Sequence, residues 1–168
     1  MALVLFDSNI LIDALKGYPP AIEELEYWDD PAISAITWME VMAGTRDDYD
    51  EVLDFLNSFG FEVIHTNQAI MIASMTIRRM SIQMGHKVAL PDAIIMGTGV
   101  VRRATIVTRN KKDFFTPNVR IPYELKSINP AEFINVDPAP GVASSSTTVL
   151  GDDWFELFKQ TISGPPQG

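Results

Sequence analysis

Five acidic or amide residues follow short apolar runs or open predicted helices, an arrangement that suits a divalent metal ion. Asp7 directly follows the run LVLF, and Asn110 and Asp113 follow the run ATIVT. Glu40 and Asp92 each lie in the first turn of a predicted helix. Oxygen atoms of these types are the hard ligands that Mg²⁺ and Mn²⁺ prefer. A metal ion held in this way is compatible with an enzyme that acts on phosphates, because a bound cation can reverse the local sign of charge.

Short apolar strands alternate with helices in the first 125 residues, and they would position these side chains. The predicted strands are 3–6, 32–36, 61–64, 104–108 and 119–121. The predicted helices run from Ser8 or Asn9, as the cap, to Gly17, and over 19–28, 37–44, 47–59, 67–84 and 91–103. This order predicts a three-layer α/β/α sandwich with a short, mostly parallel sheet. Ligands bind such sheets at the carboxyl ends of the strands.

The acidic residues also have structural interpretations. Thr37-x-x-Glu40 matches a capping box, in which the two side chains satisfy the first amides of a helix. Asp92 would favour the positive end of its helix dipole, Asp7 could cap a helix, and Asp113 could sit in a turn. Their joint occurrence on one expected edge of the sheet nevertheless favours a metal site.

The amino-acid composition excludes several classes of protein and of functional site. The chain has 168 residues, a formal net charge of −9, two histidines and no cysteine, which excludes a disulfide scaffold, a thiolate nucleophile and a cysteine-based metal site. The net charge argues against a basic DNA-coating protein. However, residues 65–125 hold nine of the 13 basic residues and only three of the 22 acidic ones, so this half could contact phosphates. No signal peptide or membrane-spanning run is found, and the cytoplasm is the expected compartment.

Four motifs occur in the order typical of one family: LFDSNILID, ITWMEVMAG, LPDAIIMGT and IVTRNKKDF. Residues 1–125 resemble the PIN-domain nucleases, and most of all the VapC-like toxins of type II toxin–antitoxin systems. The resemblance implies a Mg²⁺- or Mn²⁺-dependent endoribonuclease. It also implies a homodimer that is held inactive by a separate antitoxin protein.

The resemblance extends to individual residues. Asp7, Glu40 and Asp92 match the three central acidic positions of the family. The fourth position, often Asp, falls on Asn110, whose neutral amide would hold a cation less strongly. Asp113 is close in sequence and would supply the missing charge, so that Asp7, Glu40, Asp92 and Asp113 are the predicted metal ligands.

Other residues match supporting positions of the family. Asn9 and Thr108 would hydrogen-bond to the acidic residues and orient them. Arg109, Lys111 and Lys112 adjoin the predicted site and would hold RNA phosphates.

Two other function classes remain open. One is a PIN-like interaction domain whose activity is impaired by the change to Asn110. The other, less favoured, is a phosphatase with an aspartyl-phosphate intermediate on Asp7. Such phosphatases usually carry a second Asp two positions on, where this chain has Asn9.

Several features stay unassigned. Residues 126–168 form a predicted extension, with a Pro/Gly/Ser-rich linker at 137–148 and a short amphipathic helix at 152–162. The extension could dock on its own domain, even over the active site, or bind a neighbouring subunit or a partner. Met71, Met75, Met80 and Met84 recur at near-helical spacing, which is usual for a core face but also suits partner docking. His65 and His86 are isolated and have no predicted role.

Overall fold

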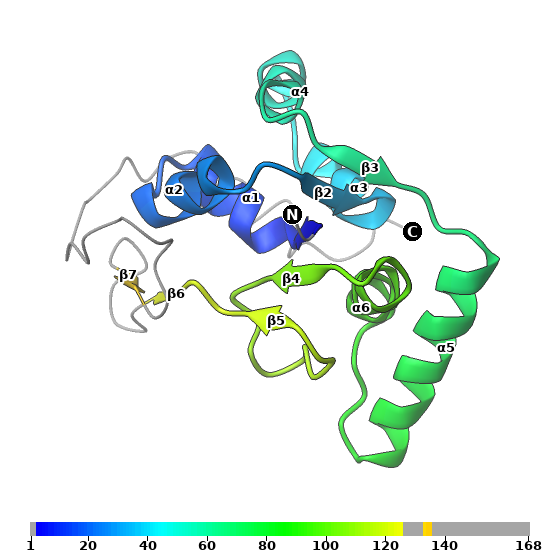
Figure 1. Cartoon of the computed structure of the whole chain (residues 1–168). Coiled ribbons are helices and arrows are strands. Elements are labelled where there is room, and N and C mark those ends of the chain that lie inside the picture. The colour runs from blue at the N-terminus through cyan, green and yellow to red at the C-terminus, as the bar shows by residue number, and fades with distance from the viewer. Residues whose placement is uncertain (1–2, 126–132, 136–168) are drawn as a thin grey trace.

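A computed structural model describes residues 3–125 and 133–135 of the chain (Figure 1). Its strands are β1 (Val4–Phe6), β2 (Pro31–Ser34), β3 (Glu62–Ile64), β4 (Thr105–Val107), β5 (Val119–Arg120), β6 (Tyr123–Leu125) and β7 (Phe133–Asn135). Its helices are α1 (Ser8–Leu15), α2 (Pro19–Tyr27), α3 (Ala35–Ala43), α4 (Tyr49–Ser58), α5 (Gln68–Gln83) and α6 (Leu90–Arg102). Among the described residues, no helix is both long and apolar enough to cross a membrane.

Five of the strands form one sheet, in the order β3-β2-β1-β4-β5, and every neighbouring pair is parallel. β1 lies in the middle, with Phe6 opposite Ile33 of β2 and Val107 of β4. The predicted mostly parallel sheet is confirmed, and so is its fifth strand. As a result, the residues that follow β1, β2 and β4 reach the same edge of the sheet.

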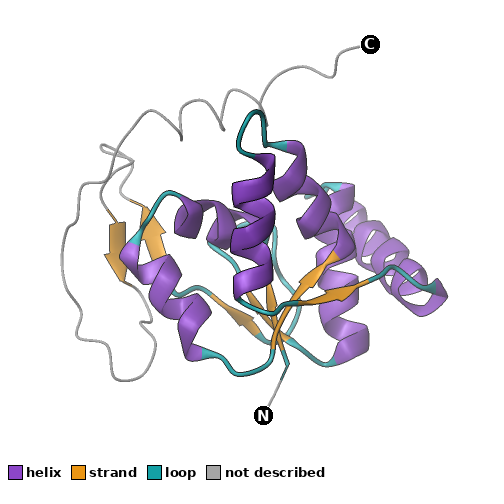
Figure 2. Cartoon of the chain, turned by 90° about the horizontal axis from the view of Figure 1, so that it is seen from above, coloured by secondary structure: helices purple, strands orange, loops and turns teal. Residues whose placement is uncertain are grey.

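Helices cover both faces of this sheet (Figure 2). Val4 and Phe6 point into a core shared with α1, α2, α3 and α4, whereas Leu5 between them points into a second core shared with α5 and α6. This alternation follows from the pleat of a strand, which sends successive side chains to opposite faces. The central strand β1 is apolar throughout because both of its faces are buried. The predicted three-layer α/β/α sandwich is confirmed.

α5 and α6 pack unusually closely. A Cβ atom on Gly97 of α6 would lie 2.8 Å from the backbone nitrogen of Ser74 in α5, so no larger residue fits there. The buried face of α5 is accordingly made of Ile70, Ser74, Ile77 and Ser81. Gly97 therefore serves the close packing of α6 against α5.

The methionines of this region lie on the outside of the domain. Their side chains and two neighbouring isoleucines are about half exposed: Met71, Ile72, Met75, Met80, Ile82 and Met84. The usual interpretation of their spacing as a core face is therefore wrong. Ile70 and Ile77 are the large apolar residues of α5 that are buried, and the other large apolar side chains of this helix lie on its exposed side.

The predicted helix caps are wrong at two places. Asp7, rather than Ser8 or Asn9, caps α1, because β1 ends at Phe6 and leaves Asp7 extended, with its carboxylate accepting from the Ser8 amide. Ser34 caps α3 by accepting from the Thr37 amide, so that Thr37 is not the cap of a capping box. The strand predicted at 32–36 ends two residues early for the same reason.

β6 was not predicted. It pairs antiparallel with β7, which lies beyond the predicted domain boundary at residue 125. These two strands lie on the opposite side of the molecule from α5 (Figure 1). The predicted linker at 137–148 and helix at 152–162 lie outside the described residues.

Candidate active site

Asp7 leaves the central strand at the carboxyl edge of the sheet and is almost fully buried, with 4% of its surface exposed. Its Oδ1 accepts a hydrogen bond from the Ser8 amide at 2.7 Å. Its Oδ2 accepts from the Thr108 hydroxyl and from the Asn9 amide group, both at 2.6 Å. Burial raises the pKa of Asp7, while these hydrogen bonds act to lower it.

Asn9 and Thr108 form a small hydrogen-bonded frame around Asp7. The parallel pairing of β1 with β4 places the residues after the two strands side by side. Asn9 Nδ2 also donates to Thr108 Oγ1 at 3.1 Å, and its Oδ1 accepts from the Arg109 amide at 3.1 Å. Thr108 Oγ1 accepts from the Asn110 amide at 2.9 Å. Their predicted role is to orient the acidic residues, and these are the contacts such a role requires.

Glu40 lies on α3, two turns after the Ser34 cap, so its carboxylate is not used to close the helix end. Partial burial raises the pKa of Glu40 to about 7. A hydrogen bond with the Ser8 side chain acts in the opposite direction, and the charges of Asp7 and Asp92 raise the pKa further. Glu40 therefore lies within electrostatic reach of both other carboxylates.

Asp92 lies in the first turn of α6 and is half-buried. Burial raises the pKa of Asp92 to about 6, and the charges of Asp7 and Asp113 contribute to the increase. The fold thus brings Asp7, Glu40 and Asp92 together from three separate segments, with Asp113 near Asp92. Like charges this close resist ionising together.

Asn110 and Asp113 hold each other in the segment after β4. Asn110 Nδ2 donates to Asp113 Oδ2 at 2.9 Å, and the Asp113 amide donates to Asn110 Oδ1 at 3.3 Å. The other carboxylate oxygen, Asp113 Oδ1, lies 2.5 Å from His86 Nε2. The hydrogen bond from Asn110 lowers the pKa of Asp113, and His86 contributes. Asp113 therefore remains ionised when its acidic neighbours are partly protonated.

The donor set fits a divalent cation by its chemistry. Burial and neighbouring negative charges raise the pKa of Glu40 and of Asp92, and a cation between these carboxylates and Asp7 would relieve the repulsion. Across residues 3–125 and 133–135, however, no group of three or more acidic or histidine side chains is already arranged to hold a metal ion. The carboxylates would therefore have to turn toward the cation as it binds.

Arg109 is held by a buried acidic partner. Its Nε lies 2.5 Å from Oδ2 of Asp13, which is fully buried. The Tyr123 hydroxyl donates to the same oxygen at 2.7 Å, and burial raises the pKa of Tyr123. The predicted phosphate contact of Arg109 would require its guanidinium to leave this ion pair.

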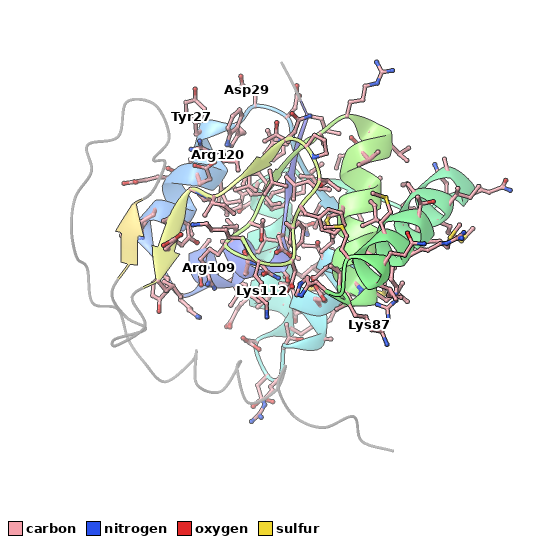
Figure 3. All side chains as sticks on the ribbon, turned by 90° about the horizontal axis from the view of Figure 1, so that it is seen from below. Tyr27, Asp29, Lys87, Arg109, Lys112 and Arg120 are labelled. Atoms are coloured by element: carbon pink, nitrogen blue, oxygen red, sulfur yellow. The ribbon has the colours of Figure 1, made fainter. Side chains whose placement is uncertain are left out.

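Lys111 and Lys112 are exposed next to Asp113. Lys111 Nζ lies 3.3 Å from a Glu124 carboxylate oxygen across an exposed ion pair, which is weak in water. In the view from below, Lys112 appears between Arg109 and Lys87 (Figure 3). The two lysines are thus free to reach outward from the carboxylate edge.

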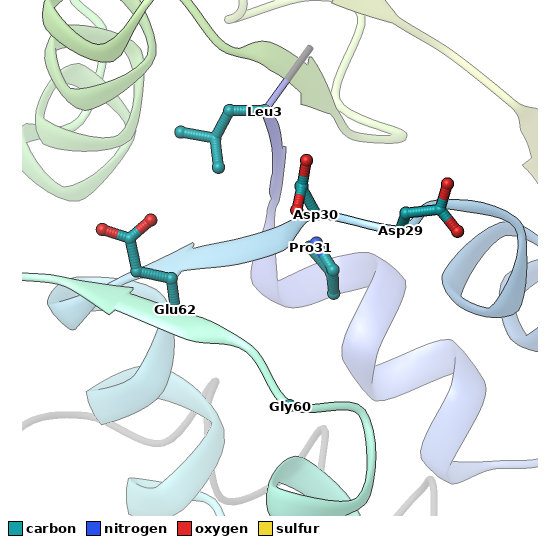
Figure 4. A pocket seen from close by; sticks show the side chains of 6 residues that line it. All are labelled: Leu3, Asp29, Asp30, Pro31, Gly60 and Glu62. Carbon is teal, nitrogen blue, oxygen red and sulfur yellow. The ribbon is translucent and has the colours of Figure 1, made fainter. Parts of the chain in front are cut away.

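A separate hollow of about 340 Å³ lies at the amino ends of the strands, lined by Leu3, Asp29, Asp30, Pro31, Gly60 and Glu62 (Figure 4). It is on the opposite edge of the sheet from Asp7. One lining carboxylate, that of Glu62, already pairs with Arg102 at 2.8 and 3.0 Å.

Comparison with known proteins assigns the chain to one family. The family model described as "PIN domain" matches residues 4–116, so the chain belongs to the PIN-domain family. Ribonuclease VapC1 of Methanocaldococcus jannaschii is 30% identical over 112 residues, which cover 66% of this chain and 78% of that protein. The chain is therefore a homologue of a VapC ribonuclease.

Solved structures agree with that assignment. A toxin–antitoxin complex from Klebsiella pneumoniae contains a chain that is 41% identical, with a TM-score of 0.63, covering 73% of this chain and 99% of its own. A DNA-bound VapBC from Salmonella typhimurium contains one that is 28% identical, with a TM-score of 0.61, covering 72% and 97%.

Two residues at this edge had no predicted role there. Ser8 was predicted only as a helix cap, yet its side chain bonds to Glu40. Its place directly after Asp7 was the available signal. His86 contacts Asp113 from 27 positions away, and no local pattern in the sequence indicates that contact.

Proposed function

We propose that this chain is a Mg²⁺- or Mn²⁺-dependent endoribonuclease and the toxin of a toxin–antitoxin pair. The observation that carries the proposal is that Asp7, Glu40 and Asp92 come from three separate segments to one edge of the sheet, where the charge of Asp7 acts on both other carboxylates. Homology to a ribonuclease supports the choice of RNA as substrate.

Asp7, Glu40 and Asp92 would hold the cation, with Asp113 beside them. When bound, such a cation lowers the pKa of a water molecule and orients it for in-line attack on a phosphodiester. Thr108 and Asn9 hold Asp7 in place, and Ser8 holds Glu40. No side chain acts as the nucleophile, and the expected products carry a 5′-phosphate and a 3′-hydroxyl.

The neutral Asn110 does not argue for an inactive interaction domain. Asp113 is hydrogen-bonded by Asn110, and its lowered pKa keeps a negative charge beside Asp92. A phosphatase with an aspartyl intermediate is disfavoured, because Asn9 donates to Asp7 at the position where a second acidic residue would be needed.

Lys111 and Lys112 are proposed to contact RNA phosphates, since both are exposed beside the carboxylates. Arg109 has the same proposed role only if it leaves Asp13, which makes it the weakest of the three candidates.

The direct test is cleavage of a tRNA and rRNA panel with Mn²⁺, comparing wild type with Asp7→Asn. The expected result is cleavage by wild type alone, abolished by EDTA and restored by Mn²⁺. Cleavage by Asp7→Asn at the wild-type rate, or by wild type in EDTA, would contradict the proposal.

A cognate antitoxin is the proposed protein partner, since the chain is 41% identical to one from a toxin–antitoxin complex. Expression of the wild-type chain alone in a bacterial host is expected to stop growth, whereas Asp7→Asn is not. The proposed compartment is the cytoplasm, where both RNA and an antitoxin would be present.

A homodimer is also proposed, through the apolar outer face of α5. Met71, Ile72, Met75 and Ile82 lie on this face and are each more than half exposed. A second copy is an occupant that would cover them. Light scattering should give a dimeric mass for wild type and a monomeric mass for Met75→Glu. Asn57→Glu places the same charge on the exposed surface of α4, which covers the other face of the sheet, and should remain dimeric.

The proposed division is a nuclease domain at 1–125 and an extension at 126–168. Deletion of residues 137–168 tests the role of the extension while keeping β6 and β7. Unchanged cleavage and unchanged oligomeric state would dismiss both self-inhibition and subunit binding by the extension.

A further inference from the structure

His86 lies between α5 and α6 and contacts the segment that follows β4. Its Nε2 is 2.5 Å from Asp113 Oδ1, while Asp113 Oδ2 accepts from Asn110 Nδ2 at 2.9 Å. Each carboxylate oxygen of Asp113 thus has its own hydrogen-bond partner: Oδ1 has His86, and Oδ2 has Asn110. Rotation of the carboxylate would break at least one of these contacts.

These contacts continue to the central strand. The Asn110 amide donates to Thr108 Oγ1 at 2.9 Å, and the Thr108 hydroxyl donates to Asp7 Oδ2 at 2.6 Å. A continuous path therefore runs from His86 through Asp113, Asn110 and Thr108 to Asp7. His86 is its outer end.

The position of His86 itself is set by α5. Its backbone amide donates to the Ser81 carbonyl at 2.9 Å, and Ser81 Oγ accepts from the Val88 amide at 3.2 Å. Arg78 Nη1 donates to the Val88 carbonyl at 2.6 Å. The segment around His86 is therefore fastened to the end of α5 at three points.

The same segment leads directly into α6, whose first turn carries Asp92. The contact between His86 and Asp113 consequently joins the segment before Asp92 to the segment that carries Asn110 and Asp113. The charge of Asp113 raises the pKa of Asp92, so the two carboxylates lie within electrostatic reach of each other.

We infer that His86 is a positioning residue that fixes the Asp113 carboxylate next to Asp92, and so supplies the charge that Asn110 lacks at the fourth acidic position. This inference rests on the proposed metal-dependent nuclease function. The side chains of His86 and Asp113 are 40% and 27% exposed, and a polar contact this exposed contributes little to folding stability. A His86 variant that binds metal more weakly but is as stable as wild type would therefore show that His86 acts as a positioning residue.

The test compares His86→Ala, His86→Gln and His65→Ala in the full chain at one fixed pH. Gln can still donate from the position of Nε2, whereas Ala cannot. His65 is the other histidine of the chain, exposed in the segment after β3, and serves as the matched control. Three quantities are measured: the Mn²⁺ dissociation constant by calorimetry, the melting temperature in EDTA, and kcat and KM for RNA cleavage.

His86→Ala is expected to weaken Mn²⁺ binding about 10-fold or more and to lower kcat with little change in KM, since groups that orient metal ligands typically contribute 10–100-fold. Its melting temperature in EDTA should stay close to that of wild type. His86→Gln should recover most of both losses, and His65→Ala should match wild type.

A wild-type Mn²⁺ affinity in His86→Ala would overturn the inference, as would a His86→Gln variant no better than Ala. Both results leave the nuclease proposal intact if wild type cleaves RNA. Failure of wild type to bind Mn²⁺ and cleave RNA would instead overturn the proposed function together with this inference.

Discussion

The Thr108 hydroxyl donates a 2.6 Å hydrogen bond to Oδ2 of Asp7, although 101 positions separate the two residues. Thr108 is fully buried and also accepts hydrogen bonds from Asn9 and Asn110. One hydroxyl group thus links the central acidic residue to the segment that carries the fourth site position.

Thr108→Val should damage both stability and activity. Valine has nearly the same shape but leaves the Asn110 amide and the Asn9 side chain without this acceptor. The free energy of unfolding should fall by about 1–3 kcal/mol, and kcat should fall about 10-fold or more. Urea unfolding and RNA cleavage measure the two effects. Thr108→Ser retains the hydroxyl, and if it behaved like Val, the hydrogen bonds would not be the cause.

Millimolar Mg²⁺ or Mn²⁺ should raise the melting temperature of the wild-type protein. A cation that binds only the folded chain stabilises it by mass action, and here it would also relieve repulsion among Asp7, Glu40 and Asp92. Thermal unfolding with and without Mn²⁺ is the measurement. Equal melting temperatures would remove the support for a metal site here.

Asp92→Asn should be more stable than wild type in EDTA, yet inactive. The amide removes a half-buried charge that repels Asp7 and Asp113, and with it a predicted metal ligand. Melting in EDTA and RNA cleavage with Mn²⁺ should therefore change in opposite directions. A variant that is both less stable and inactive would show that Asp92 mainly supports the fold.

The metal-free protein should lose stability as the pH rises. The pKa of Glu40 is raised from its ordinary 4.5 to about 7, so the folded state holds a proton that the unfolded chain has already released. The favourable contribution is complete below about pH 4.5 and is lost as the pH passes 7. Melting curves in EDTA from pH 4.5 to 8 should show Glu40→Gln gaining on wild type as the pH rises. A constant difference between the two would contradict the raised pKa.

Substitutions of the basic residues beside the site should have two different effects, one on RNA binding and one on stability. The double variant Lys111→Ala/Lys112→Ala should raise KM for RNA. It should also make RNA binding less sensitive to salt: the slope of the logarithm of affinity against the logarithm of salt concentration should become shallower by about 0.7 for each lost phosphate contact. The melting temperature should barely change, because both side chains are exposed.

Arg109→Ala should instead unfold more easily. It leaves the buried Asp13 carboxylate without its closest cation, which costs about 3–5 kcal/mol for a buried pair. Lys16 Nζ, 3.7 Å from Asp13, should keep the loss near the lower value. A higher KM with unchanged stability would instead place Arg109 among the RNA contacts.

The approach of Asp7, Glu40 and Asp92 to one another could be predicted from sequence, because each lies at the start of a helix or within its first two turns. The fold class followed from the same alternation of apolar strands and helices. Strand and helix limits were harder to predict, because Asp7 and Ser34 take extended backbone angles that turn them into caps. A shift of one residue in these limits changes which side chain hydrogen-bonds to the first amides of the helix and which side chain remains available for the metal site.

Two features escaped prediction for physical reasons. The contact of His86 with Asp113 depends on how the segment before α6 lies against the one after β4, and a lone histidine has no periodic signal. The exposed methionines of α5 misled because its buried face uses Ser74 and Ser81 against Gly97, where close approach matters more than hydrophobicity.

The central position of β1 has a consequence for the timing of activity. Asp7 is synthesised about a hundred residues before Thr108, and its Oδ2 gains the hydrogen bond from the Thr108 hydroxyl only after β4 has joined β1. Contacts so far apart in the chain form late in folding. An unfinished or truncated chain that lacks β4 therefore has no assembled site. The order of the strands itself delays the chemistry until nearly the whole domain has been synthesised.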